Sequence, residues 1–219
     1  DGGGGRTAAR RLSMCGRFNV DSDPLSRLLL ELVKLRHPGP DNHNAAPTET
    51  IVVLRLDETG APELVPMRWW LTPHWAKDAG TRYAMFNARS ETVERSRAFR
   101  EPFRKRRCVV PVSGFYEWAR QSDPGSGGPL ESFAILTTDA AEGLAFVHDR
   151  QPAMLGLAEA RRWLDPEAST EELKALLSSR VPVDLDAVPV STWVNNARHK
   201  DLRVLEPIAD PVAVAAEPS

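Results

Sequence analysis

The chain has 219 residues and a formal net charge of -2, with 42% hydrophobic and 26% charged residues. This length accommodates one domain with a sizeable core, and the composition is ordinary for a globular protein. The charge excludes a globally basic nucleic-acid-binding protein but allows a local basic groove. Two cysteines form neither a disulfide framework nor a metal site, so we expect a reducing, intracellular compartment and no bound metal.

The ends of the chain differ from its middle. Residues 1–14 are rich in glycine and arginine and lack the apolar core of a secretory signal. We expect them to form a disordered extension or a leader that is removed. One domain is predicted at residues 15–210, followed by a frayed tail at residues 211–219. No apolar run approaches the ~20 residues that a membrane span requires.

The stretch Met14-Cys15-Gly16-Arg17 places a thiol directly after a methionine. Aminopeptidases remove a methionine that precedes a small residue, so translation from Met14 would leave Cys15 first. An N-terminal cysteine carries an α-amine and a thiol on adjacent carbons. The amine condenses with an aldehyde to an imine, and the thiol then closes a thiazolidine ring. The alternative is an ordinary buried cysteine, which is what most free cysteines are.

The first elements are a helix and a hairpin. Asp23-Pro24, followed by leucines at helical spacing, predicts a helix that stops at residues 37–40. Residues 51–56 and 63–68 flank a polar turn and predict a β-hairpin. Beyond it, Trp69 and Trp70 are predicted to be packed inside. Trp75 follows a proline in loop-like sequence, so we expect it to be exposed and able to stack on a nucleobase.

The middle of the chain combines a short strand with a basic segment. Residues 83–89 predict a strand, and Ser90 is expected to cap a helix. That helix and its continuation carry Arg95, Arg97, Arg100, Arg104, Lys105, Arg106 and Arg107. A solvated helix face explains part of this cluster, and a phosphate-binding rim explains its density better.

Two titratable side chains are candidates for proton transfer. Glu117 lies among three aromatic residues in a strand that continues from residues 108–112. A carboxyl group in an aromatic pocket has a raised pKa and can act as general acid and base, whereas simple strand alternation would turn Glu117 to solvent. His148 is expected at the end of an apolar strand, where Asp149 or Arg150 would set its tautomer and charge, unless it is purely structural.

The C-terminal third predicts alternating strands and helices. We expect strands at residues 133–138 and 188–195 and helices at residues 158–164 and 169–177. The second helix begins with a capping box formed by Ser169 and Glu172.

Five short pieces in this order resemble the SOS-response-associated peptidase (SRAP) family, the abasic-site-shielding proteins. They are Met14-Cys15-Gly16-Arg17-Phe18, Asn44-x-x-Pro47, Phe86-Asn87-Ala88-Arg89-x-Glu91, Gly114-Phe115-Tyr116-Glu117-Trp118 and Val147-His148-Asp149-Arg150-x-Pro152. The resemblance runs from Cys15 to about Pro207, and the ordered set is far more specific than any one piece.

The resemblance implies an α+β fold: a single SRAP-like domain with a curved, mainly antiparallel β-sheet barrel and peripheral helices around a positively charged groove. It implies capture of abasic sites in single-stranded DNA through a thiazolidine crosslink to Cys15. By the same resemblance, Asn87 orients the cysteine and Glu117 exchanges protons with the amine and the sugar. His148 would assist opening of the sugar ring and proton transfer at the imine.

The resemblance also implies a set of DNA-binding residues. Arg17 and Arg89 would bind phosphates beside the lesion, and Pro47 and Trp75 would pack or stack on the flanking nucleotides. Gly16 and Asn44 complete the expected DNA-binding set. We expect no cofactor, no metal and no membrane partner, and a monomer in the cytoplasm that associates with the nucleoid.

Two departures from the family pattern keep alternatives open. Residues 121–129 are too short to hold the strands that the family has after the Glu117 strand, and Cys15 is not the first residue of this chain. A thiazolidine cannot close while residues 1–14 block the amine. The alternatives are a cysteine-type peptidase that removes its own leader with His148 or Glu117 as partner, and a module that binds single-stranded DNA without covalent chemistry.

Overall fold

The computed structural model describes residues 16–73, 75–76, 85–117 and 131–217. Its strands are β1 (Arg17–Val20), β2 (Asn42–Ala45), β3 (Thr50–Leu56), β4 (Pro62–Trp69), β5 (Asn87–Arg89), β6 (Gly114–Tyr116), β7 (Ser132–Phe133), β8 (Ile135–Asp139), β9 (Arg150–Pro152), β10 (Leu185–Ala187) and β11 (Val212–Val214). Its α-helices are α1 (Ser22–Val33), α2 (Arg100–Lys105), α3 (Leu157–Leu164) and α4 (Thr170–Ala175). Short 3₁₀ helices lie at η1 (Glu142–Leu144), η2 (Thr192–Asn195) and η3 (Leu202–Leu205).

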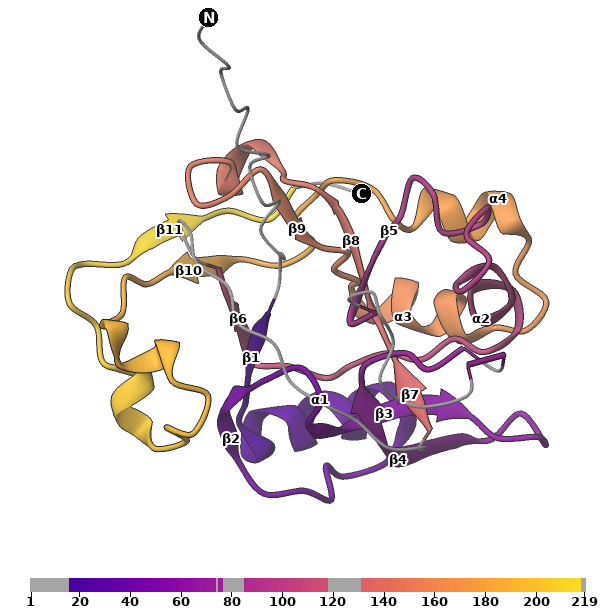
Figure 1. The fold of residues 1–219 in the computed structure, drawn as a ribbon, viewed down its shortest axis with the longest axis horizontal. Coiled ribbons are helices and arrows are strands. Elements are labelled where there is room, and N and C mark those ends of the chain that lie inside the picture. Colours follow the sequence, from indigo (N-terminus) through magenta and orange to yellow (C-terminus); the bar gives the residue numbers. More distant parts are fainter. Residues whose placement is uncertain (1–15, 74, 77–84, 118–130, 218–219) are drawn as a thin grey trace, which may run out of the picture.

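The strands form four small sheets, ordered β2–β1–β6, β3–β4–β7, β5–β8–β9 and β10–β11. All pairings are antiparallel except β4–β7 and β5–β8. Figure 1 shows α2, α3 and α4 gathered on one side of the molecule. The predicted mainly antiparallel α+β fold with peripheral helices is therefore confirmed, although the described strands do not close into one barrel. None of the helices in the described residues is long and apolar enough to cross a membrane.

The predicted hairpin is formed by β3 and β4. Thr50 lies opposite Arg68 and Leu56 lies opposite Pro62. The turn between the strands is closed by Asp57, whose Oδ1 accepts hydrogen bonds from the backbone N–H of Thr59 at 2.8 Å and Ala61 at 2.9 Å. Gly60 adopts a φ of +83° there, a conformation that costs a residue without Cβ little.

Trp69 at the end of β4 is the central side chain of the sheet core. It has no exposed surface, and its ring stacks on Phe18 of β1 with centroids 3.9 Å apart. On β7, Phe133 lies parallel to the indole at 6.4 Å. The indole N–H donates to the carbonyl oxygen of Phe86 at 2.9 Å, directly before β5. One buried side chain thus joins three of the four sheets, and the predicted burial of Trp69 is confirmed.

Two of the remaining apolar clusters of the core join the helices to one another and β6 to the C-terminal part of the chain. The larger one packs α1, α3 and α4 together through Leu29, Trp163 and Leu173. The smaller one joins Phe115 of β6 to Leu144 of η1 and Val214 of β11. The predicted capping box of α4 is confirmed, because Ser169 N–H donates to Glu172 at 2.9 Å and Glu172 N–H donates to the Ser169 hydroxyl at 3.2 Å.

Several predicted elements differ from the structure because tertiary contacts or proline outweigh local propensity. Residues 91–99 form successive turns rather than a helix, and the helix is confined to α2. Residues 108–112 make a single bridge, between Val109 and Leu54, because Pro111 has no N–H to continue a ladder. Helix α1 begins at Ser22 with Asp21 as N-cap, earlier than the predicted cap at Asp23.

The C-terminal predictions also change. Residues 145–147 are a turn that follows η1, so His148 does not lie at the end of an apolar strand. Residues 188–195 give one bridge, between Val190 and Pro207, and then η2 instead of a continuous strand. The expected frayed tail contains β11, which pairs with β10 and places Val214 in the core.

The stacking and hydrogen bonding of Trp69 predict a large effect of substitution. Trp69→Phe removes the hydrogen bond to the Phe86 oxygen, which keeps its bond from Ile135 N–H, and leaves a void beside Phe18. We expect a loss of about 2 kcal/mol or more in the free energy of unfolding, measured by chemical denaturation followed by circular dichroism. The control is Trp75→Phe, at a 42% exposed side chain, which we expect to cost less than about 0.5 kcal/mol. Equal losses in the two variants would contradict a central role for Trp69.

Candidate functional site

The first part of the candidate site lies where β1 pairs with β6. Arg17 is opposite Tyr116 in antiparallel register. Gly16 precedes Arg17 and Glu117 follows Tyr116 in the sequence, so these two residues come next along the pair. The register therefore brings Gly16 to Glu117, which is half-buried. A side chain at Gly16 would meet no atom within 4 Å, so the position is open. Cys15 itself lies outside the described residues.

Arg17 is held in place by Asn44 and by the loop that contains η2. Its guanidinium donates to Asn44 Oδ1 at 2.8 Å, to the Val194 carbonyl at 2.9 Å and to the Asn195 carbonyl at 3.1 Å. Burial is the main cause of a lowered Arg17 pKa, which nearby Glu49 partly offsets. An arginine starts from so high a pKa that the guanidinium stays cationic at neutral pH. Arg17 thus presents a fixed cation beside the β1–β6 pair.

Asn44 itself is completely buried. Its Nδ2 donates to the carbonyl oxygens of Val194 at 3.0 Å, Asn196 at 3.1 Å and His199 at 3.0 Å. The Asn44 side chain therefore connects Arg17 to the loop at residues 194–199 and holds the two together. This geometry revises the expectation for Asn44, because a side chain without exposed surface can act on DNA only through the position of Arg17.

The second part of the candidate site is the sheet β5–β8–β9. Asn87 lies opposite Ile135, Arg89 lies opposite Thr137, and Thr137 in turn faces Pro152 of β9. Asn87 is half-buried and Arg89 is exposed. His148 stands two residues before β9, so one sheet positions all three predicted side chains, Asn87, Arg89 and His148.

His148 has two neighbours that act on its Nδ1. The backbone N–H of Arg150 donates to Nδ1 at 3.0 Å, and Asp149 Oδ1 lies 2.9 Å from the same atom. The backbone donor favours a neutral ring with its proton on Nε2, whereas the carboxylate favours a proton on Nδ1. Both residues that were expected to set the tautomer therefore contact the ring. The Nδ1 atom of His148 is therefore held by the backbone and by Asp149, which fixes the orientation of the ring.

Arg150 anchors the segment that carries His148. Its side chain is 4% exposed, and its guanidinium binds both carboxylate oxygens of Glu91. It also donates to Asp139 at 2.5 Å and to the Thr137 carbonyl at 2.7 Å. A buried guanidinium requires such partners because an uncompensated charge is costly. The sequence predicted a role for Arg150 only beside His148 and none for Glu91, and the structure shows that this pair ties the two motifs together.

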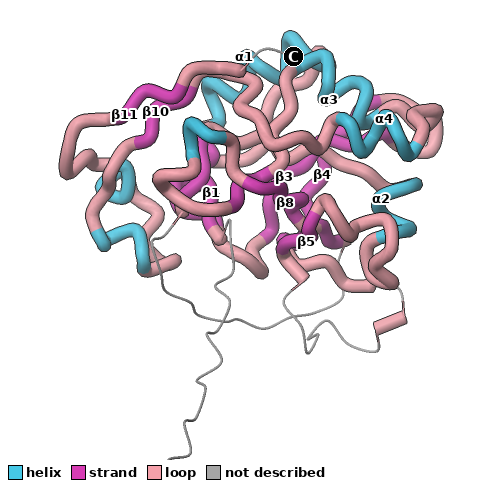
Figure 2. Tube along the Cα trace, turned by 90° about the horizontal axis from the view of Figure 1, so that it is seen from above, coloured by secondary structure: helices cyan, strands magenta, loops and turns pink. Residues whose placement is uncertain are grey.

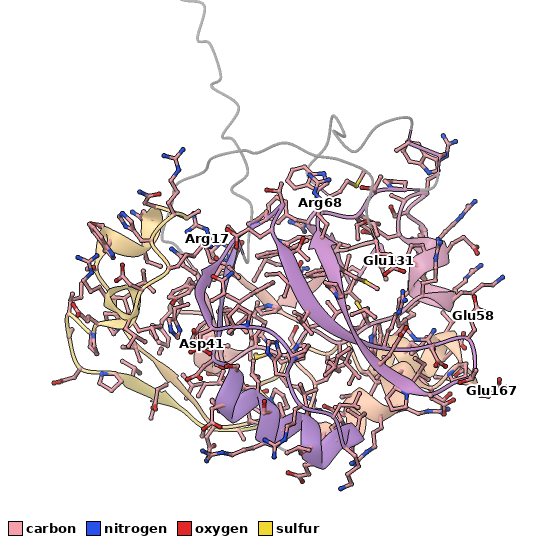
Figure 3. The ribbon with its side chains drawn as sticks, turned by 90° about the horizontal axis from the view of Figure 1, so that it is seen from below. Arg17, Asp41, Glu58, Arg68, Glu131 and Glu167 are labelled. Carbon is pink, nitrogen blue, oxygen red and sulfur yellow. The ribbon has the colours of Figure 1, made fainter. Side chains whose placement is uncertain are left out.

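Trp75 and Pro47 lie at two loops. Trp75 is 42% exposed, as predicted, and the guanidinium carbon of Arg97 lies 4.8 Å from the centroid of its ring. Pro47 is half-buried in the turn between β2 and β3, next to Thr48, which has a φ of 77°. Figure 3 shows Arg17 in the upper left part of the molecule, while Glu58 lies far from it on the right-hand side.

The two parts of the site are connected through the core. Phe18, next to Arg17, stacks on Trp69, and Trp69 contacts Phe86, next to Asn87, with centroids 6.2 Å apart. Phe115 beside the Glu117 end of β6 packs in the cluster that contains Leu144, close in sequence to His148. Apart from Pro47 and Trp75 in their loops, the described candidate residues thus lie on or next to two sheets that share buried side chains. No group of three potential metal ligands occurs among the described residues, and residues 121–129, where the family pattern is shortened, lie outside them.

The Glu91–Arg150 pair predicts a pH-dependent contribution to stability. The hydrogen bond from Arg150 is the main cause of a lowered Glu91 pKa. A carboxyl group whose pKa is lower in the folded state stabilises the protein above its unfolded pKa of about 4.3, and this contribution is lost as the pH falls through the folded pKa. We expect Glu91→Gln to lower the free energy of unfolding by about 1 kcal/mol at neutral pH, a modest figure because the Glu91 side chain is 44% exposed.

Denaturation curves at about pH 7 and about pH 3 test this expectation, because the difference from the parent should shrink at the lower pH. Glu58→Gln, at an exposed turn residue, is the matched control. A Glu91→Gln penalty of the same size at both pH values would show that the ion pair is not its source.

The sequence is similar to a known protein family and to characterised relatives along most of its length. The chain matches the family model described as SOS response associated peptidase (SRAP) over residues 14–127 and 120–197. The abasic site processing protein YoaM of Bacillus subtilis is 29% identical over 223 residues, covering 88% of this chain and 98% of YoaM. The abasic site processing protein HMCES of Rattus norvegicus is 32% identical, covering 89% of this chain and 76% of HMCES.

Solved structures share the fold. A phage-related protein from Bordetella bronchiseptica superposes with a TM-score of 0.58 at 27% identity, covering 74% of this chain and 87% of that one. A protein from Bacteroides thetaiotaomicron gives a TM-score of 0.57 at 21% identity, covering 73% and 85% of the two chains. The family model, the relatives along most of the chain and the arrangement of the motifs agree: this chain belongs to the SOS response associated peptidase (SRAP) family.

Proposed function

We propose that this protein processes abasic sites in single-stranded DNA by a covalent crosslink to Cys15, as the first residue of the active form. The observation that carries the proposal is the β1–β6 register, which pairs Arg17 with Tyr116 and so brings Gly16, the residue after Cys15 in the sequence, to Glu117. The relatives YoaM and HMCES bear the name abasic site processing protein, which supports the same substrate. The activity belongs to DNA repair.

The proposed chemistry conserves all atoms with one water released. The ring-opened deoxyribose presents an aldehyde at C1′, and the neutral α-amine of Cys15 adds to it. The resulting carbinolamine loses its hydroxyl group as water once that group is protonated, leaving an imine. The thiol sulfur then adds to the imine carbon and the thiol proton passes to the nitrogen, which closes a thiazolidine.

The proton transfers require groups that the two sheets supply. Glu117 takes a proton from the attacking amine and returns one to the departing hydroxyl. His148 moves the proton that opens the sugar ring, and the contacts at its Nδ1 orient the ring for that transfer. Asn87, on the neighbouring β5, orients Cys15. Each of these roles needs only a side chain within hydrogen-bond reach of the reacting atoms.

The DNA strand is held by cations and by apolar rings. Arg17, fixed by Asn44, and Arg89, exposed on β5, bind phosphates on the two sides of the lesion. Trp75 and Pro47 contact neighbouring nucleotides, Trp75 by stacking on a base. Gly16, where the structure is open, lets the sugar approach the start of the chain.

The direct test is a denaturing gel that follows covalent capture. A chain that begins at Cys15 is mixed with a single-stranded oligonucleotide that contains one abasic site, or with its intact counterpart. We expect a crosslinked band with the abasic oligonucleotide alone. Cys15→Ser retains the amine but lacks the thiol, so we expect a band only after borohydride reduction. Cys108→Ser should behave like the parent, because burial raises the pKa of the Cys108 thiol to about 12 and keeps it unreactive.

The same assay separates the other candidate activities. A stable band from Cys15→Ser without reductant would refute closure by the thiol. If the parent binds the oligonucleotide but gives no crosslinked band, and Cys15→Ala binds with the same affinity, the protein would be a non-covalent DNA-binding module. Cleavage of residues 1–14 or of a peptide in the absence of DNA, lost in Cys15→Ala, would instead support a cysteine peptidase.

Replacement of Glu117 tests its role in proton transfer. Glu117→Gln keeps the shape of the side chain and removes the exchangeable charge, so we expect crosslinking to slow by about 10²-fold or more. Non-covalent affinity for the intact oligonucleotide should stay within about twofold, because a carboxylate adds nothing to phosphate binding. Glu58→Gln is the control and should leave both quantities unchanged. A parent-like rate in Glu117→Gln would exclude Glu117 as the proton carrier.

A further inference from the structure

A strip of exposed cations runs along the segment that joins β5 to β6. It consists of Arg95, Arg97, Arg100, Arg104, Lys105 and Arg106, and we refer to these six residues as the basic strip. Arg95 lies 3.8 Å from a carboxylate oxygen of Glu94. Within the described part of the chain, no carboxylate lies within 4.0 Å of the other five side-chain cations. The strip is therefore a surface of positive charge that nearby acids do not balance.

Two partly exposed arginines elsewhere on the surface are balanced by contact ion pairs. Arg162 binds Asp165 and Glu172, and Arg55 binds Glu63 and Glu131. Uncompensated like charges repel one another, and a run of them is retained at a cost to folding stability. This concentration of exposed cations without matching carboxylates favours an anionic partner for the strip.

Arg107, the last member of the predicted basic cluster, has a different role. Its guanidinium donates to the carbonyl oxygens of Trp163 at 2.6 Å, Asp165 at 2.7 Å and Arg104 at 2.6 Å. Burial lowers the pKa of Arg107. These bonds fix the end of α2 against α3, so Arg107 is structural and does not belong to the strip.

The basic strip is rigidly mounted and begins at the candidate site. Val93, Ala98 and Phe103 alternate with its cations along the segment and are buried at 2%, 8% and 3% exposure. At the start of the segment, Glu91 binds Arg150, and Arg97 lies over the ring of Trp75. In Figure 2, α2 lies at the right-hand edge and the preceding loops connect it with β5.

We propose that the basic strip is a second phosphate-binding site, which takes the DNA strand as it leaves Trp75 and runs along residues 95–106. Phosphates of a single strand bind such cations with release of counterions, which adds affinity without base specificity. The proposal rests on the proposed function for the direction of the strand. It assigns to the strip a contribution to affinity that grows with the length of the DNA and has no part in the chemistry.

The test uses intact single-stranded oligonucleotides of about 8 and about 30 nucleotides, because binding sites for single strands commonly span ~4–16 nucleotides. Fluorescence anisotropy gives the affinity at several salt concentrations. For Arg100→Gln/Arg104→Gln/Lys105→Gln we expect the salt dependence of binding to the long oligonucleotide to fall by about 2 in slope, since each phosphate contact contributes about 0.7. The affinity at low salt should fall at least about tenfold.

Two comparisons make the result specific. The short abasic oligonucleotide should crosslink to the triple variant as it does to the parent, which separates this proposal from the proposed function. Arg27→Gln/Lys34→Gln/Arg36→Gln removes three exposed cations around α1 and should leave the slope unchanged. A triple variant that keeps the parent slope and length dependence would overturn the proposal. So would an equal loss in the α1 control, or equal competition by polyglutamate and DNA for the strip.

Discussion

The structure depends on the buried ring of Trp69. It stacks on Phe18 and Phe133 and donates its indole N–H to the backbone of Phe86, so three sheets meet at one side chain. Each of the four sheets has at most three strands, and such small sheets are marginal on their own. The shared ring fixes β1, which follows Cys15, relative to β5, which carries Asn87 and Arg89. Preorganised chemistry on two sheets requires this kind of common support.

Two arginines show how the fold separates support from function. Arg150 is buried and its charge is matched by Glu91 and Asp139, so it joins the His148 segment to β5 and to the turns after it. Arg17 is positioned by the buried amide of Asn44, which itself is fixed by three backbone carbonyls. Both motifs therefore contain a residue for chemistry or binding and a residue that holds it. The basic strip extends the same logic to the surface, because buried Val93 and Phe103 hold its cations outward.

The sequence predicted the features that follow from local residue patterns. It did not predict the elements and side-chain environments that are set by contacts between distant segments. Alternation and turn residues predicted the β3–β4 hairpin, and proline placement predicted the exposure of Trp75. The turns at residues 91–99 were missed, because Glu91 reaches a partner that lies 59 positions away in sequence. Pattern could not show that Asn44 is buried or that Arg107 is structural, since their partners are backbone carbonyls of remote segments. Family resemblance identified the candidate residues, and the structure shows which of the described ones are buried and which contacts hold them.

The most direct test of the account is the chemical state of Cys15 in the crosslinked product. A chain that begins at Cys15, captured on abasic single-stranded DNA, is treated with borohydride and with a thiol-alkylating reagent under denaturing conditions, and its mass is measured. A Cys108→Ser background removes the second thiol. The account predicts the sum of protein and oligonucleotide less one water, with no change after either treatment, because amine and thiol share one carbon. A gain of two hydrogens together with an alkyl group would reveal an open imine and a free thiol, and would contradict the thiazolidine.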